Sequence, residues 1–248
     1  MEKQKDVLFE RGKKYFQEGD YESAYNYFLE AILQNHGSEA LVYMGLMYLW
    51  GVYPRKDWDK AFQYFKDYYE ETKDTIVLPT LMDFMDDNFK SKHAVKLYMD
   101  FLDFLIEHEV WQTYITKALE YGDKDGIHQY VPTDYQMKEN LLKEAVKHGV
   151  NYGYSCLGEM YFLGELDSIY GKENKYKNAY EYFVKGPQNQ TMPLYYLGEM
   201  YKDGLYVKKD IDKAIEYYKA VTNINLPMIK EDLHYNMATE RLQELENC

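Results

Sequence analysis

The sequence predicts an all-α fold, a right-handed α–α solenoid of about six helical hairpins followed by a C-terminal capping helix. Three observations support this prediction. A glycine–tyrosine–glycine pattern recurs along the chain and is clearest in the stretch 197–221. Each clear copy is followed by a small residue and an aromatic residue four positions apart. No segment alternates apolar and polar residues for long enough to suggest a sheet. A chain that repeats one helical hairpin is expected to stack its copies into a solenoid.

Each clear copy begins with a glycine, has a tyrosine three residues later and has a second glycine three residues after that. The copies are Gly45–Tyr48–Gly51, Gly158–Tyr161–Gly164 and Gly198–Tyr201–Gly204. A glycine inside a helix costs about 1 kcal/mol relative to alanine, so its recurrence at one position indicates close approach of the partner helix. The second glycine follows the last apolar residue, where a helix C-cap favours left-handed backbone.

The second helix of each copy carries an alanine and, four residues later, an aromatic residue. This spacing places both on one helix face. The pairs are Ala61 with Phe65, Ala179 with Phe183, and Ala214 with Tyr218. The first glycine precedes the alanine by 16 residues in two copies and by 21 in the copy at Gly158, which predicts an insertion at about 167–177. An N-terminal copy with Gly12 and Ala24 has a separation of only 12.

These motifs, LGxMYxxG followed by a loop and KAxxYY, resemble the tetratricopeptide superfamily and more closely its Sel1-like branch. The separation of 16 residues is typical of Sel1-like repeats, whereas the separation of 12 is that of an ordinary tetratricopeptide. The resemblance covers four hairpins, about two thirds of the chain, and is weaker between residues 73 and 149. The chain contains no flexible Gly/Ser linker, so we predict a single repeat domain over residues 1–248.

The first three hairpins are expected at about residues 5–34, 38–71 and 75–108. Asp20 follows the turn glycine of the first hairpin and is a suitable N-cap for its second helix, and Asp57 stands at the matching place in the second. The third hairpin is degenerate. Its first helix, at about 77–89, lacks the usual glycine, but its second helix keeps Ala94, Tyr98 and Phe101 at the expected offsets.

The remaining elements are three further hairpins and a cap, expected at about 111–149, 151–186, 191–223 and 228–246. In the fourth hairpin Lys138 occupies the position of the small residue, so the family pattern fails there. The fifth and sixth hairpins are regular. The last helix is polar along one face, as a solenoid cap should be.

Composition narrows the class of protein. The 248 residues include 42 acidic and 29 basic side chains, a net charge of −13. This charge disfavours binding to nucleic acid or to an anionic membrane and favours a basic partner. There are two cysteines, no apolar signal core and no apolar run of about 18 residues, so we expect a cytoplasmic protein without membrane segments.

The high number of tyrosines, 29, has two possible explanations. They are expected mainly to fill the seams between helices, with their hydroxyl groups at wet rims. The alternative is that some of them form a recognition surface.

No pattern of residues predicts catalysis. His108-Glu109 begins like a zinc protease motif, but Gln112 stands where the second histidine ligand is required. Asp123 and Asp125 begin like a calcium loop, but its glycine comes two residues early. We therefore expect no enzyme, no cofactor and no metal site.

The resemblance also implies where a partner binds. In tetratricopeptide proteins the groove is lined by residues three before, one after and four after the helix glycine, and these share one stripe of the helix. In this chain the positions are Phe9, Lys13 and Phe16 in hairpin one, Val42, Leu46 and Leu49 with the adjacent Trp50 in hairpin two, Ser155, Glu159 and Phe162 in hairpin five, and Tyr195, Glu199 and Lys202 in hairpin six.

The leading hypothesis is a non-enzymatic scaffold that binds a protein or peptide segment in its concave groove. Two alternatives remain open. One is a dedicated regulator, such as a toxin-neutralising immunity protein, whose acidic charge covers a basic site on its target. The other is a hydrolase acting on peptide or cell-wall material, for which the sequence offers no nucleophile or base.

Overall fold

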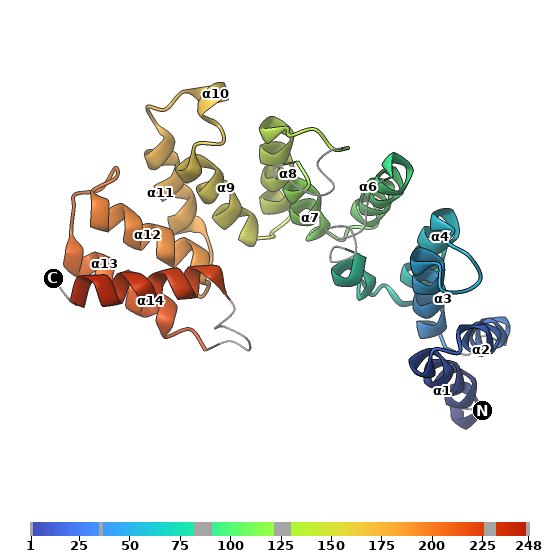
Figure 1. Ribbon diagram of the computed structural model, residues 1–248. Coiled ribbons are helices and arrows are strands. Elements are labelled where there is room, and N and C mark those ends of the chain that lie inside the picture. Colours follow the sequence, from blue (N-terminus) through green and yellow to red (C-terminus); the bar gives the residue numbers. More distant parts are fainter. Residues whose placement is uncertain (1, 35–36, 82–90, 122–129, 226–231, 247–248) are drawn as a thin grey trace. The chain divides into compact units, whose positions relative to one another are not determined.

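The computed structural model describes residues 2–34, 37–81, 91–121, 130–225 and 232–246 (Figure 1). Every regular element in these ranges is a helix, which confirms the predicted all-α fold. The helices are α1 (Glu2–Glu18), α2 (Tyr21–Leu33), α3 (Glu39–Trp50), α4 (Trp58–Thr72), α6 (Lys92–Glu107), α7 (Thr113–Leu119), α8 (Tyr135–Lys147), α9 (Tyr152–Leu163), α10 (Asp167–Tyr170), α11 (Lys175–Lys185), α12 (Thr191–Asp203), α13 (Ile211–Thr222) and α14 (Leu233–Glu246).

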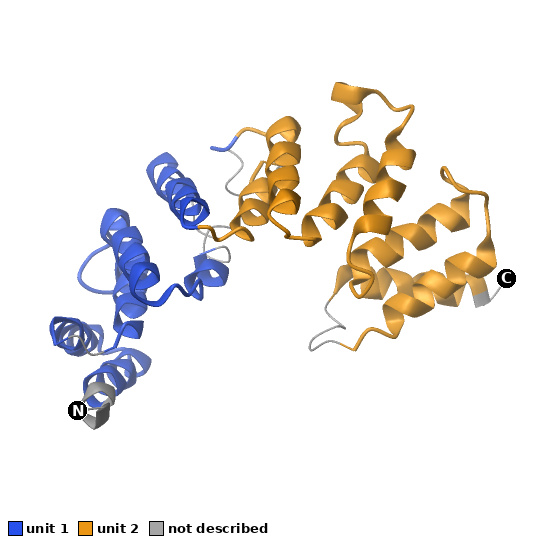
Figure 2. Cartoon of the chain, turned by 180° about the vertical axis from the view of Figure 1, so that it is seen from behind, with its two compact units in different colours: residues 1–108, 124–131 blue, residues 109–123, 132–248 orange. Residues whose placement is uncertain are grey.

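The chain forms two compact units (Figure 2). Unit 1 comprises residues 1–108 and 124–131, and unit 2 comprises residues 109–123 and 132–248. In unit 1, α1 pairs with α2 and α3 pairs with α4, and α2 packs on α3. In unit 2 the pairs are α7 with α8, α9 with α11, and α12 with α13, and α14 packs on α12 and α13. Each unit is therefore a stack of helical hairpins, as an α-solenoid requires.

The first glycine of each repeat lies under an aromatic ring of the second helix, as its recurrence predicted. A Cβ atom added to Gly198 would lie 2.5 Å from Cε1 of Tyr218, and one added to Gly12 would lie 2.6 Å from Cε1 of Phe28. Gly45 and Gly158 have the same relation to Phe65 and Phe183. All four rings are fully buried. The glycine thus removes the side chain that would separate the two helices.

The predicted helix ends are also confirmed. The carboxylates of Asp20 and Asp57 accept hydrogen bonds from the backbone N–H of Ser23 and Lys60, each at 3.1 Å. Asp134 and Asp210 cap α8 and α13 in the same way. The second glycine of each repeat adopts the left-handed C-cap conformation, with φ of 71° at Gly51, 80° at Gly164 and 73° at Gly204.

The tyrosines line the seams in a regular manner. The tyrosine three residues after each repeat glycine stacks on a tyrosine of the second helix, with ring centroids 5.4–5.8 Å apart and planes within 17°, in the pairs Tyr15–Tyr27, Tyr48–Tyr64, Tyr161–Tyr182 and Tyr201–Tyr217. Hydrogen bonds then link successive hairpins. Tyr25 shares one with Tyr48 at 3.2 Å, and Tyr180 shares one with Tyr201 at 3.4 Å. These ten tyrosines therefore lie in the seams between helices, as expected.

The middle hairpins depart from the repeat, as expected. Of the predicted helix at 77–89, only residues 77–81 lie in the described part of the chain, whereas α6 buries Ala94, Tyr98 and Phe101. Lys138, at the small-residue position of α8, is buried and forms a 2.8 Å ion pair with Glu165. The cap begins at Leu233, and residues 228–231 of its predicted range lie outside the described residues.

Candidate partner-binding surfaces

In unit 1, four rings from α1 and α3 form a connected aromatic face, which we define as Phe9, Phe16, Tyr43 and Trp50. The ring of Phe16 meets Tyr43 edge-on at 5.2 Å and lies 6.0 Å from Trp50, and Phe9 meets Tyr43 at 5.6 Å. Residues seven apart lie on the same side of a helix, so each helix contributes one pair of rings. The buried ring of Phe28 lies beneath them, 5.0 Å from Tyr43.

The edges of this face are partly open to solvent. Trp50 is 39% exposed, and Phe9, Phe16, Val42 and Leu46 are half-buried. The Nζ atom of Lys13 lies 5.9 Å from the Phe9 ring centroid and 3.9 Å from a carboxylate oxygen of Glu10. Leu49, in contrast, is fully buried, so it belongs to the core and is not presented to a partner.

The predicted groove positions of unit 2 have a different character. Ser155 and Tyr195 are buried, and so they too are core residues. Phe162 is half-buried and packs against Tyr196 and Tyr176, with ring centroids 4.8 and 5.6 Å away. Ser155, Phe162 and Tyr195 therefore do not form an open apolar surface.

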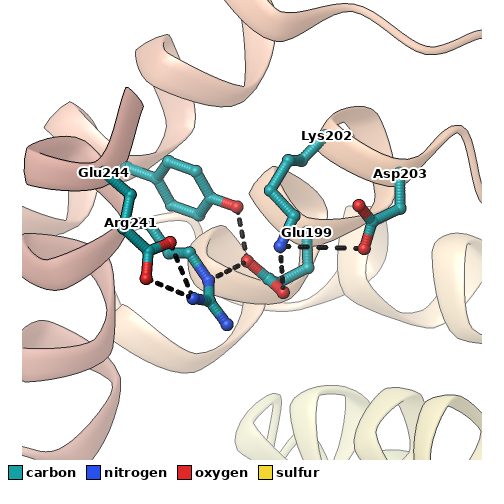
Figure 3. A network of polar contacts seen from close by, with 6 residues as sticks. Glu199, Lys202, Asp203, Arg241 and Glu244 are labelled. Atoms are coloured by element: carbon teal, nitrogen blue, oxygen red, sulfur yellow. Dashed lines mark hydrogen bonds and ion pairs between the residues drawn. The ribbon is translucent and has the colours of Figure 1, made fainter. Parts of the chain in front are cut away.

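Glu199 is the centre of a polar network in unit 2 (Figure 3). Its Oε1 atom accepts hydrogen bonds from the Tyr218 hydroxyl at 2.5 Å and from Arg241 Nε at 3.1 Å, and its Oε2 atom accepts one from Lys202 Nζ at 2.9 Å. Burial acts to raise the pKa of Glu199, but the bonds from Tyr218 and Lys202 outweigh it, so the pKa is lowered. Arg241 also binds Glu244 at 2.9 Å.

Glu159 stands one residue after its repeat glycine, as Glu199 does, and is likewise engaged by the chain itself. It accepts a 2.9 Å hydrogen bond from the Tyr196 hydroxyl, and His234 Nε2 lies 3.8 Å from the same oxygen. Burial acts to raise the pKa of Glu159, but the interactions with His234 and Tyr196 lower it overall. Both carboxylates of the predicted groove therefore face residues of α14.

Sequence reasoning missed three residues of these surfaces. Tyr43 completes the aromatic face, and its spacing of seven from Trp50 was the available signal. His234 and Arg241 are also seven apart, but nothing local to α14 indicates that they meet carboxylates of α9 and α12.

The described residues contain no group of three or more His, Cys, Asp or Glu side chains placed to hold a metal ion. No helix in the part of the chain that the structure describes is long and apolar enough to cross a bilayer. Burial raises the pKa of Cys156 to about 12, which leaves its thiol protonated at neutral pH and a poor nucleophile.

Comparison with known proteins places the repeats in a family. Four segments, residues 7–36, 38–66, 157–186 and 194–220, match the Sel1 repeat. They coincide with hairpins one, two, five and six. A protective antigen present in uropathogenic Escherichia coli strains, displaying an SLR fold, is similar in structure, with 16% identity, 87% of this chain and 53% of that chain covered and a TM-score of 0.50. This chain thus spans about half of that protein. At 16% identity the similarity indicates a shared fold and nothing further.

A Sel1 repeat protein from Oxalobacter formigenes is also similar, with 22% identity, 88% of this chain and 85% of that chain covered and a TM-score of 0.48. The glycine–aromatic contacts, the left-handed C-caps and the four matched segments agree with one another. The chain is a Sel1-like repeat protein.

Proposed function

We propose that this protein is an interaction scaffold and that the aromatic face of unit 1 binds a segment of another protein. The observation that carries the proposal is Trp50, a large apolar side chain at the rim of a cluster of packed rings. Sel1 repeats generally mediate protein–protein interaction, which agrees with this function. We propose that Val42 and Leu46 of α3 extend the same surface.

The chemistry of the face suits protein recognition. Tryptophan and tyrosine dominate the residues that contribute most to binding, because they bury a large area at little cost in side-chain entropy. The rings of Phe16 and Tyr43 already pack on the buried Phe28. Their positions are thus fixed before a partner arrives, which lowers the entropic cost of association. Lys13 supplies one positive charge beside the rings, a contact for a carboxylate of the partner.

The test compares variants of the full chain in affinity purification from the native host, with retained proteins quantified by mass spectrometry. Trp50→Ala removes the exposed ring. Leu33→Ala is the control, because Leu33 is 77% exposed but lies on α2, the second helix of its hairpin. Circular dichroism of both variants verifies that the fold is retained.

We expect proteins that are retained by the wild type and by Leu33→Ala to be lost from Trp50→Ala. Removing an aromatic residue that anchors an interface costs about 2 kcal/mol or more, so retention should fall at least about tenfold. Equal retention by the wild type and Trp50→Ala would refute the assignment of the face.

A further inference from the structure

The loop between α12 and α13 presents an exposed tyrosine in an unusual backbone conformation. Tyr206 is 55% exposed and has a φ of 65°, a left-handed value that a bulky side chain rarely adopts. Leu205 and Val207, on either side of it, are partly buried and pack against the core of unit 2. Since both neighbours pack inward, the loop directs the Tyr206 ring outward.

The chain fixes the position of this loop. The backbone N–H of Leu205 donates to the carbonyl of Met200 and that of Asp210 donates to the carbonyl of Tyr201, each at 2.9 Å. The Tyr206 ring leans on the ring of Tyr180 in α11, with centroids 5.6 Å apart and planes at 54°. A strained conformation persists only where its surroundings enforce it. The ring is thus placed before any partner arrives, which lowers the entropic cost of binding.

Three ammonium groups lie in and after the same loop. Lys208 and Lys209 are exposed, and neither forms an ion pair with another residue that the structure describes. The Nζ atom of Lys213 donates a 2.8 Å hydrogen bond to the Tyr201 hydroxyl and lies 4.2 Å from the centroid of that ring. The side-chain partner of Lys213 is therefore a phenol and not a carboxylate.

The nearby carboxylates are mostly engaged by the chain itself. Residues 203–213 contain three aspartates. Asp203 forms a 3.7 Å ion pair with Lys202, and the Asp210 side chain accepts a 3.0 Å hydrogen bond from the backbone of α13, which it caps. Asp212 is exposed. In a chain with a net charge of −13, this loop thus offers two unpaired cations beside an exposed ring. Such a surface is complementary to carboxylates of a partner.

Hairpin two contains the same loop with its tyrosine already engaged. Its sequence GVYPRKD matches GLYVKKD of hairpin six position by position. Arg55 and Lys56 take the places of the two lysines and are likewise exposed. Tyr53, in contrast, is half-buried and donates a 3.2 Å hydrogen bond to Glu22. Unit 1 therefore repeats the cations of the loop without a free ring, which makes it a matched control.

We propose that Tyr206, Lys208 and Lys209 form a binding surface for an acidic segment of a partner protein. Carboxylates of the segment pair with the two ammonium groups, and an aromatic side chain packs in the corner between the rings of Tyr206 and Tyr180. The surface lies wholly within unit 2 and involves no residue of the aromatic face. It stands or falls independently of the function proposed for unit 1.

The first test titrates a fluorescent oligoglutamate peptide with one central phenylalanine into the full-length chain and follows its anisotropy. The variant Lys208→Glu/Lys209→Glu reverses both charges at the surface. Arg55→Glu/Lys56→Glu is the control, because it makes the same change in net charge in the matching loop. We expect the wild type and the control to bind alike. Binding to Lys208→Glu/Lys209→Glu should be at least about tenfold weaker, the scale of one charged hydrogen bond.

Three results of this titration would overturn the proposal. One is no binding to the wild type. Another is an equal loss in the two double variants, which would show that net charge alone governs binding. The third comes from an oligolysine peptide with the same phenylalanine and from an oligothymidylate. If either binds the wild type more tightly than the acidic peptide and loses affinity in Lys208→Glu/Lys209→Glu, the surface does not select an acidic protein segment.

The second test separates the role of the Tyr206 ring in binding from any role in stability. Asparagine tolerates left-handed backbone, so Tyr206→Asn should unfold at the same urea concentration as the wild type or at a higher one. Its affinity for the acidic peptide should fall about fivefold, the scale of one aromatic pair. A lower urea midpoint with unchanged affinity would show that the ring serves the fold, and would overturn its place in the binding surface.

Discussion

A Cβ atom on Gly158 would lie 2.6 Å from Cδ1 of Phe183, nearer than a real Cβ atom approaches a ring carbon. The ring of the second helix therefore rests on the bare backbone of the first. The same contact recurs in the three other matched hairpins, at Gly12, Gly45 and Gly198. A pattern of single residues in the sequence thus fixes how closely the two helices of each hairpin approach.

Replacing Gly158 with alanine tests this contact. On helix propensity alone the change should stabilise the protein by about 1 kcal/mol. Because the added methyl group overlaps a fully buried ring, we expect destabilisation of about 1–3 kcal/mol instead, measured by urea unfolding. A more stable Gly158→Ala protein would contradict the packing.

A double-mutant cycle isolates the contact between the two residues. The second substitution is Phe183→Leu, which removes the ring that the methyl group meets. The cost of Gly158→Ala should be smaller by at least about 0.5 kcal/mol in the Phe183→Leu background, since residues in direct contact are not additive. Additive effects would show that the two positions do not constrain each other.

Glu139 links hairpin four to hairpin five through a fully buried side chain. It accepts hydrogen bonds from the hydroxyl groups of Tyr161 at 2.9 Å and Tyr170 at 2.8 Å. Its replacement by alanine leaves the buried Tyr161 hydroxyl without its acceptor and removes the 2.7 Å ion pair with Lys143, so we expect a loss of about 2–4 kcal/mol in thermal or urea unfolding. The control is Glu144→Ala. Glu144 forms an ion pair with Lys147 near the surface, so this substitution should change stability by less than about 0.5 kcal/mol.

Acid should destabilise unit 2. Burial acts to raise the pKa of Glu139, Glu159 and Glu199, but hydrogen bonds and nearby cations outweigh it and lower each below the ordinary value of 4.5. A carboxylate with a lowered pKa stabilises the fold above its unfolded pKa, and this contribution is lost as pH falls through the folded pKa. Urea midpoints should therefore be constant near neutrality and fall below about pH 4.5. Glu199→Gln should show a smaller fall than the wild type.

Alkali should destabilise the protein by ionising tyrosines whose pKa is raised in the fold. The hydrogen bond with Tyr201 and partial burial raise the pKa of Tyr180 to about 12, and burial together with the charge of Glu199 raises the pKa of Tyr195 to about 12. A raised pKa gives stability that is present below the unfolded value of 10 and is lost as pH rises toward 12. Ultraviolet titration of phenolate should show a late group of tyrosines that ionises together with loss of helix. Ionisation of every tyrosine near pH 10 in folded protein would contradict these environments.

The regular hairpins were predictable because their signals are local. Gly51, Asp57 and Ala61 each act through the backbone or the partner helix of one hairpin, and their places in the structure agree with the prediction. The same holds for Ala94 and Tyr98, where the hairpin is degenerate but its second helix keeps the pattern.

The candidate site was less predictable, because its geometry depends on contacts between hairpins. Spacing places Leu49, Ser155 and Tyr195 on the groove stripe, but packing against neighbouring helices buries all three. Similarly, Lys138 breaks the pattern within its own helix, and its partner Glu165 follows the end of the next helix, α9, in the sequence. Only the three-dimensional arrangement shows that this lysine forms an ion pair.

The most direct test of the central claim, that the aromatic face of unit 1 binds a protein, is site-specific photo-crosslinking in the native host. A photoreactive amino acid replaces Leu46, beside the face, or Leu33 on α2 as a control, in the full-length chain. We predict that position 46 gives covalent adducts of the same discrete masses in repeated experiments and that position 33 gives none of them. The adducts from position 46 should be lost when Trp50→Ala is introduced into the same chain. Identical adducts from both positions, or persistence of the Leu46 adducts in Trp50→Ala, would contradict the account.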